Sequence, residues 1–338
     1  MKLAARIAPV LHTGRGLGSG VMLCAVIAMA STFVTAHYGG PLFLFALLFG
    51  TTFHYLHAHP DTRAGVEWCS TTILRLGVGL LGARITAEQV AALGWQTAAI
   101  TIGAVLSTLA LGMLLARRMG LARWQGVISG GAVAICGATA ALALASVVPR
   151  KPERDPYTLL VVVSVTAMSA MAMVVYPILT QLLGLSSTQA GLFIGASIHD
   201  VAQVVGAGYT VGHETGDIAT IVKLFRVALL AVIVVAVAAF YRARPTQHES
   251  GAKTPLIPWF LALFALLVLL NSLGFIPPAA QQGMGEVSRA CLVVAIAALG
   301  IKTSFQEVAQ AGWRPLLLIG IETVWIAAFT LLALCWLS

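Results

Sequence analysis

Long runs of apolar residues follow one another along almost the whole chain, separated only by short polar connections. A helix needs about 20 apolar residues to span the roughly 30 Å hydrocarbon core of a bilayer, and many of these runs are that long. Because lipid offers the backbone no hydrogen-bond partners, such runs are expected to be helices. The chain is 59% hydrophobic and 9% charged, with a mean hydropathy of +0.93. We therefore exclude a soluble fold and predict an all-α polytopic membrane protein.

The apolar runs predict about eleven transmembrane helices. The spans are approximately 16–36, 41–57, 68–84, 90–115, 124–148, 157–183, 190–211, 217–241, 256–274, 287–303 and 315–337. A cytoplasmic segment, 1–15, is expected to precede a single transmembrane domain, 16–338. Several spans are short or rich in glycine, so we expect one or two of them to be re-entrant or broken, with discontinuous helices.

The net charge of +8 follows from the composition of the loops and does not indicate a nucleic-acid partner. Lys and Arg gather in the cytoplasmic loops of membrane proteins. With the N-terminus inside, alternate loops place twelve of the 20 basic residues inside and five outside. Arg150, Lys151 and Arg154 are three of those five and oppose the trend. The bias predicts a cytoplasmic N-terminus.

A stretch near residue 80 recurs near residue 298. LLGARITAEQVAALGWQ, residues 80–96, aligns without gaps with ALGIKTSFQEVAQAGWR, residues 298–314. The two spans concerned are seven apart, an odd number, so the copies should cross the membrane in opposite directions. Inverted repeats are common in secondary transporters, whose sites lie between the copies near the midplane. The repeat halves are approximately 41–118 and 256–337, around a glycine-rich central region, 124–241.

The segment 191–226 combines ionisable residues with glycines inside apolar sequence. Its polar candidates are His199, Asp200 and Gln203 in one span, and Lys223 and Arg226 in the next. The i, i+4 pair His199 and Gln203 and the i, i+3 pair Lys223 and Arg226 would each share a helix face. Ionisable residues are expensive inside a membrane and are functional-site candidates by default.

The charges inside the predicted spans do not balance. Three basic residues, Arg75, Lys223 and Arg226, oppose two acidic residues, Asp200 and Glu322. If each carboxylate pairs with one base, one cation is left over, and an unpaired buried cation is costly. A bound anion held by Arg226, Lys223 and Gln203 would resolve the imbalance, while Arg75 and Glu322 would form a structural ion pair. In the alternative, Lys223 or Arg226 extends to the membrane surface and needs no ligand.

The fifth predicted span contains Gly130, Gly131 and Gly137, which favour a break in the helix. Free N–H groups at a helix start attract anions, and Ser129 and Thr139 add hydroxyl donors. We therefore include Ser129, Gly130, Gly131 and Thr139 among the predicted substrate-binding residues. Close helix packing is the alternative explanation of the glycines.

Other motifs in the chain are weak. Gly77–Gly82 fits G-x-G-x-x-G, but no strand precedes it. His54, His57 and His59 with Asp61 lack a second group of metal ligands, which favours a wet histidine cluster at a span end. The five cysteines show no C-x-x-C spacing. We therefore expect no metal and no other cofactor.

Four stretches together resemble the YeiH-type sulfate exporter family of bacterial inner-membrane proteins. They read LRLGVGLLGARIT from Leu74, SGGAVAICGATAALA from Ser129, GLFIGASIHDVAQVVGAGY from Gly191 and VKLFRVALLA from Val222. The resemblance covers nearly the whole chain. It implies a multi-pass protein of the bacterial plasma membrane and a sulfur oxyanion as substrate. It also implies the architecture of cation–proton antiporters and bile-acid symporters, with a panel and a core of crossed discontinuous helices.

Three functions compete. The first is a secondary exporter of a small oxyanion, sulfate or sulfite, with His199 and Asp200 carrying the coupling proton. The second is a cation–proton antiporter that uses Asp200. The third is a membrane-embedded enzyme or sensor, which no nucleophile–base constellation supports, so we expect no enzyme. The expected partners are a small anion and the lipid bilayer, and the sequence leaves open whether copies of the chain form a homo-oligomer.

Overall fold

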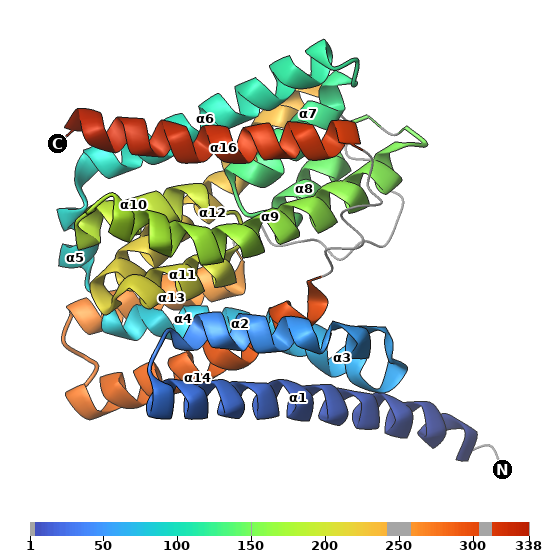
Figure 1. Cartoon of the computed structure of the whole chain (residues 1–338), viewed down its shortest axis with the longest axis vertical. Coiled ribbons are helices and arrows are strands. Elements are labelled where there is room, and N and C mark those ends of the chain that lie inside the picture. The colour runs from blue at the N-terminus through green and yellow to red at the C-terminus, as the bar shows by residue number, and fades with distance from the viewer. Residues whose placement is uncertain (1–3, 150, 242–257, 304–312, 338) are drawn as a thin grey trace. The chain divides into compact units, whose positions relative to one another are not determined.

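The computed structural model describes residues 4–149, 151–241, 258–303 and 313–337, and every regular element in these ranges is a helix (Figure 1). Six helices in the described ranges are long and apolar enough to cross a membrane. They are α1 (Ala4–Tyr38), α6 (Gly94–Arg118), α9 (Arg154–Leu182), α12 (His213–Tyr241), α14 (Pro278–Lys302) and α16 (Trp313–Leu337). The prediction of a helical, multi-pass membrane protein is confirmed.

Shorter helices accompany these six. The apolar ones are α2 (Leu42–Thr52), α8 (Ala138–Val147), α11 (Val201–Val211) and α13 (Trp259–Ser272). The remaining elements are η1 (His54–Ala58), α3 (Pro60–Trp68), η2 (Cys69–Ile73), α4 (Leu74–Leu81), η3 (Gly82–Arg84), α5 (Ala87–Ala92), α7 (Arg123–Ala134) and α10 (Ser187–Ser197). The chain forms two compact units, one of residues 1–87 and 262–304, the other of residues 88–261 and 305–338.

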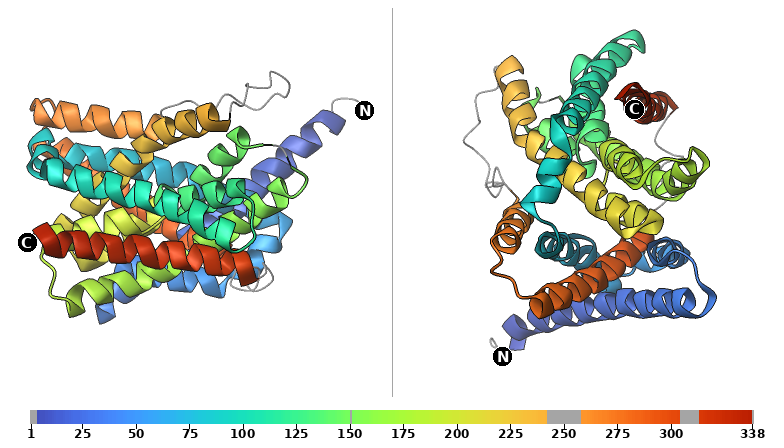
Figure 2. Two further views of the ribbon diagram at one scale, coloured as in Figure 1. Left: turned by 90° about the horizontal axis from the view of Figure 1, so that it is seen from above. Right: turned by 90° about the vertical axis from the view of Figure 1, so that its left-hand side faces the viewer.

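In the first unit α14 lies against α1, α2 and α4, which the right-hand view of Figure 2 shows. Ser288 Oγ donates a hydrogen bond to the carbonyl of Gly77 at 2.6 Å, and Lys302 Nζ donates to Ser70 Oγ at 3.2 Å. At the other end of the pair, Gly285 faces the side chain of Arg84. Along these contacts the residue numbers increase on the α4 side and decrease on the α14 side. The helices α4 and α14 are therefore antiparallel.

Two glycines of the repeated sequence make equivalent contacts in this unit. A Cβ on Gly82 would collide with the carbonyl oxygen of Phe264 in α13, and a Cβ on Gly300 would collide with that of Leu47 in α2. Only a residue without a side chain permits backbones to approach so closely. Each copy of the repeat therefore uses the same glycine for a close backbone contact with a helix from the other predicted repeat half, α13 for Gly82 and α2 for Gly300. The second half of the repeated stretch, 304–312, lies outside the described residues.

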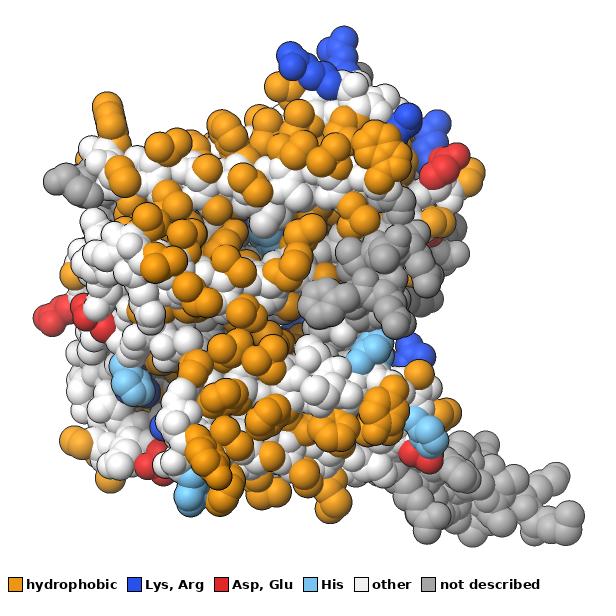
Figure 3. Space-filling view, in the orientation of Figure 1, with side chains coloured by type: hydrophobic (Ala, Val, Ile, Leu, Met, Phe, Trp, Pro, Cys, Tyr) orange, Lys and Arg blue, Asp and Glu red, His pale blue; other side chains and the backbone are white. Residues whose placement is uncertain are grey.

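In the second unit a core of small and branched apolar side chains joins α6, α7, α8, α9, α12 and α16. The outward sides of the long helices are apolar as well, for example at Leu106 and Leu114 on α6 and at Val324 and Leu332 on α16. Figure 3 shows such side chains over the visible side of α16. Apolar residues on both the inner and outer sides of a long helix are typical of a helix in lipid.

The segment predicted as one span at 124–148 is a hairpin of α7 and α8. Its connection ends at Gly137, whose φ of +62° is a conformation that favours glycine. A Cβ on Gly131 would collide with the side chain of Leu144. These two residues would lie about 20 Å apart in a straight helix. The chain therefore turns back at 135–137 and returns to the side from which α7 starts.

The segment predicted as one span at 190–211 is also a hairpin, formed by α10 and α11. Gly191 of α10 and Gly208 of α11 both face the carbonyl of Thr215, near the start of α12. In a straight helix they would lie about 25 Å apart. The structure thus corrects the count of these two segments as single crossings, and it shows that they are the spans that fold as re-entrant hairpins. The length and composition of an apolar run are the same for one full crossing and for two half crossings, so the sequence indicated re-entrant or broken spans without showing which ones they are.

The first hairpin also resolves the exception in the charge distribution. Because α8 returns to the side where α6 ends, the connection before α9 lies on that same side of the unit. Arg117, Arg118, Arg123, Lys151 and Arg154 therefore share one side. The basic residues before α9 follow the positive-inside trend once the hairpin is recognised.

Candidate functional site: the meeting point of two hairpin tips

Lys223 and Arg226 extend from α12 to the tips of both hairpins. Both side chains are completely buried. Gly195 of α10 makes this approach possible, because a Cβ there would collide with the carbonyl of Ala219 in α12. The i, i+3 spacing then directs both cationic side chains toward the connections at 135–137 and 198–200, as the sequence predicts for residues on one helix face.

The Arg226 guanidinium donates only to backbone carbonyls. Its Nε donates to Ala134 O at 2.9 Å, Nη1 donates to Gly195 O and Ile198 O at 3.0 and 2.9 Å, and Nη2 donates to Val133 O and Ala134 O at 3.0 and 2.6 Å. A guanidinium has five N–H donors, so all of them are occupied. Arg226 joins the end of α7 to the end of α10.

Lys223 makes a similar but incomplete bridge. Its Nζ donates to Ile135 O at 2.6 Å and to Ile198 O at 2.9 Å. An ammonium group has three donors. One N–H of Lys223 therefore has no partner among the described residues.

The two cations lie where the backbone is negative. The last carbonyls of a helix have no partner within the helix and carry about half a negative charge in total. The carbonyls bound by Lys223 and Arg226 belong to the last turns of α7 and α10 or follow them directly. Both cations thus neutralise helix ends, which the sequence could not show because it does not reveal free carbonyls.

The starts of α8 and α11 lie at the same tips and carry the opposite partial charge. No side chain caps the start of α8, and Thr139 in its first turn is exposed. At the start of α11, Asp200 accepts a hydrogen bond from Ala202 N at 2.9 Å, and the Asp200 amide donates to Ser169 Oγ at 3.0 Å. An anionic cap at a helix start is favourable.

His199 lies beside Asp200 and is completely buried. Its Nδ1 lies 3.1 Å from Val133 O and its Nε2 lies 3.0 Å from Thr323 Oγ1. A carbonyl can only accept, so Nδ1 carries a hydrogen. The Thr323 hydroxyl also lies 2.8 Å from Ile319 O. When His199 is neutral, the Thr323 hydroxyl can donate its hydrogen to Nε2. When His199 is protonated, the hydroxyl can donate to Ile319 O and accept a hydrogen bond from Nε2. The contact therefore suits both protonation states of His199.

The other predicted site residues lie at different places in the second unit. Gln203 is completely buried, and neither its Oε1 nor its Nε2 has a hydrogen-bond partner among the described residues. Gly130 and Gly131 stay inside the continuous helix α7, where they pack against α6 and α8, so the break falls after them, at 135–137. Ser129 Oγ donates to Glu322 Oε1 at 2.9 Å. The substrate-binding roles of these residues stay predictions.

The predicted pair of Arg75 and Glu322 joins residues of different units and stays a prediction. Arg75 is exposed on α4. Glu322 is completely buried on α16, and Ser129 is its hydrogen-bond partner there. Thr323, the next residue, is a contact of His199 that the sequence did not predict, because a threonine in an apolar helix usually bonds its own backbone.

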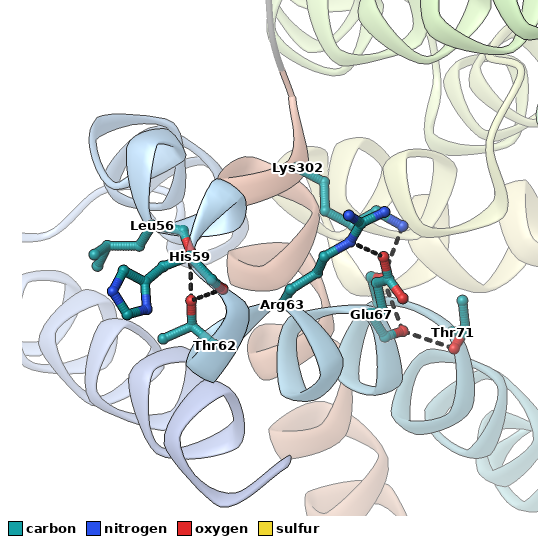
Figure 4. Close-up of polar contacts among 8 residues, drawn as sticks. Leu56, His59, Thr62, Arg63, Glu67, Thr71 and Lys302 are labelled. Carbon is teal, nitrogen blue, oxygen red and sulfur yellow. Dashed lines mark hydrogen bonds and ion pairs between the residues drawn. The ribbon is translucent and has the colours of Figure 1, made fainter. Parts of the chain in front are cut away.

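The histidine cluster belongs to the first unit, and Figure 4 shows one of its members, His59, together with Arg63, Glu67 and Lys302 at the end of α14. His54 Nδ1 lies 2.8 Å from Ile301 O, and the exposed His59 and Asp61 are 3.7 Å apart. Arg63 donates to Glu67 at 3.0 Å. Within the described ranges, no set of three metal-ligating side chains comes together.

The fold and the site define a class: a multi-pass helical membrane protein with two re-entrant hairpins whose tips meet at buried cations. The chain belongs to the family described as conserved hypothetical protein 698, which matches residues 19–319 and whose relatives are UPF0324 membrane proteins. One relative, from Chlorobaculum tepidum, is 43% identical over 94% of this chain and 89% of its own length. The UPF0324 membrane protein TauZ of Paracoccus pantotrophus is 44% identical over 92% of both chains, and a relative from Rhizobium meliloti is 40% identical over 95% and 93%.

Proposed function

We propose that this protein is a secondary transporter that exports a small oxyanion, such as sulfate or sulfite, across the bacterial plasma membrane. The observation that carries the proposal is the charge at the hairpin tips. Lys223 and Arg226 contribute two positive charges, and the ends of α7 and α10 offset about one of them. The starts of α8 and α11 contribute about one positive charge, which Asp200 offsets. About one positive charge is left for a bound anion to neutralise.

The donors at the tips suit an oxyanion. Arg226 has no free N–H donor, and its role in this proposal is to hold the two hairpin tips together. The main contact with the substrate is instead the free N–H of Lys223. The uncapped N–H groups at the start of α8 and the hydroxyl of Thr139 are further donors. Helix starts inside broken segments bind anionic substrate groups in other transporters.

Three further features support a transporter. The equivalent contacts of Gly82 and Gly300 agree with an inverted repeat. The basic residues on one side of the second unit agree with a cytoplasmic N-terminus. Two relatives carry the name TauZ, which suggests a link with taurine, a sulfur compound.

The test uses the purified full-length chain in proteoliposomes loaded with unlabelled sulfate or sulfite. We expect exchange of the corresponding radiolabelled anion across the membrane. Lys223→Met removes one charge-assisted hydrogen bond to the anion, worth about 1.5–3 kcal/mol. It should therefore raise the half-saturating anion concentration about tenfold to hundredfold, whereas Arg75→Met should not. Sodium transport without any response to an oxyanion would favour the cation–proton antiporter and refute the proposal.

A further inference from the structure

Glu322 is a buried acid that forms no ion pair with any residue that the structure describes. Its side chain is completely buried in α16, and its Oε2 has no hydrogen-bond partner among the described residues. Its Oε1 accepts a single hydrogen bond, from Ser129 Oγ at 2.9 Å. Transferring an ionised carboxylate from water to such a place costs several kcal/mol unless a cation compensates it. The group avoids this cost by binding a proton.

The described residues that pack around Glu322 leave room for the carboxyl group and form no ion pair with it. A Cβ on Gly112 of α6 would lie 2.5 Å from Glu322 Oε1, so the carboxyl occupies space that only a glycine leaves free. α16 packs against α6, α7, α9 and α10. Of the titratable groups on these helices, Tyr157 of α9 is a phenol that carries no positive charge, and Arg117, Arg118 and Arg123 lie exposed at helix ends.

The position of Glu322 links it to the hairpin tips. Ser129 lies six residues into α7, about 9 Å along the helix from its start. The next residue of α16, Thr323, contacts the His199 ring at the tip of the second hairpin. Any movement of the tips relative to α16 would therefore change the surroundings of Glu322.

From this geometry we propose that Glu322 is the proton-binding carboxyl of the transport cycle. The acid holds a proton while Ser129 and Gly112 enclose it as in this structure, and it releases that proton when the helices around it separate. The coupling role rests on the proposed transport function, whereas the bound proton does not.

The proton is tested directly by infrared difference spectroscopy of the full-length chain in lipid at neutral pH. Subtracting Glu322→Gln from wild type should leave the C=O stretching band of a protonated carboxylic acid. Glu214→Gln, which alters an exposed glutamate of α12, should leave none. Gln keeps the shape of the side chain and can still accept from Ser129. Glu322→Asp gives a second test, because it should shift the band. The absence of a protonated band assignable to Glu322 would overturn the proposal.

The coupling role is tested in the sulfate-loaded proteoliposomes. Glu322→Gln resembles the protonated state permanently, so exchange of labelled for unlabelled sulfate should persist while stimulation by an imposed pH gradient is lost. Stimulation that survives in Glu322→Gln would overturn the coupling role. A protonated band together with a wild-type protein that moves no oxyanion would confirm the bound proton and refute the proposed function instead.

Discussion

Arg226 should contribute more to stability than Lys223, although both are buried cations on the same face of α12. The difference follows from the carbonyls that each one satisfies. Replacing Arg226 by Met leaves Ala134 O and Gly195 O without the only hydrogen-bond donor that the structure gives them. Replacing Lys223 by Met leaves only Ile135 O without a donor, because Arg226 still binds Ile198 O.

A buried polar group that loses its partner costs about 1–3 kcal/mol. Arg226→Met should therefore destabilise the second unit by about 2–6 kcal/mol, and Lys223→Met by about 1–3 kcal/mol. For a region of this size, 1 kcal/mol corresponds to about 2–4 °C in the melting temperature. Arg226→Met should thus lower the melting temperature of the solubilised protein by about 4 °C or more, and by more than Lys223→Met does.

The assay is thermal unfolding of the purified variants in one detergent at one scan rate, because unfolding of such proteins is often irreversible. Arg75→Met is the matched control. It also removes a positive charge, but the Arg75 side chain is exposed and donates no hydrogen bond among the described residues. If Arg226→Met melts at the same temperature as Arg75→Met, the guanidinium does not hold the two tips together and the assignment fails.

Two other predictions concern the repeat and the first hairpin. Gly82→Ala and Gly300→Ala should each destabilise the protein by about 1–3 kcal/mol, because the new Cβ overpacks against a backbone carbonyl. Gly320→Ala is the control, because its Cβ would meet nothing within 4 Å. In the same melting assay this control should be neutral or slightly stabilising. In a background with Cys335→Ser, a membrane-impermeant thiol reagent should label Lys151→Cys in inside-out vesicles and not in intact cells, and Thr188→Cys should show the opposite pattern. Labelling of Lys151→Cys from outside would mean that α7 and α8 form a single crossing.

The sequence predicted the helical membrane fold, and it offered the burial of the i, i+3 cations of α12 as one of two alternatives. It did so because the cost of burying charge and the period of a helix are both local properties. Re-entrant or broken spans were expected, but the two hairpins were counted as single crossings, because α7 and α8 together have the length of one crossing. The sequence also did not show that Arg226 lies among negatively polarised backbone carbonyls. The surplus of basic residues suggested an anion bound directly by Arg226. Arg226 instead binds free backbone carbonyls at helix ends, and these acceptors cannot be recognised from the amino-acid sequence.

The central claim, an oxyanion bound where the hairpin tips meet, is tested most directly by protection of a thiol at the start of α8. Thr139→Cys, in a chain whose native cysteines are replaced, places an exposed reporter in the first turn of that helix. We predict that sulfate slows the modification of this cysteine by a thiol reagent, whereas sodium chloride at equal ionic strength does not. Trp95→Cys, which is exposed on α6, should react at the same rate in both salts. Equal modification rates of Thr139→Cys in the two salts would contradict the account.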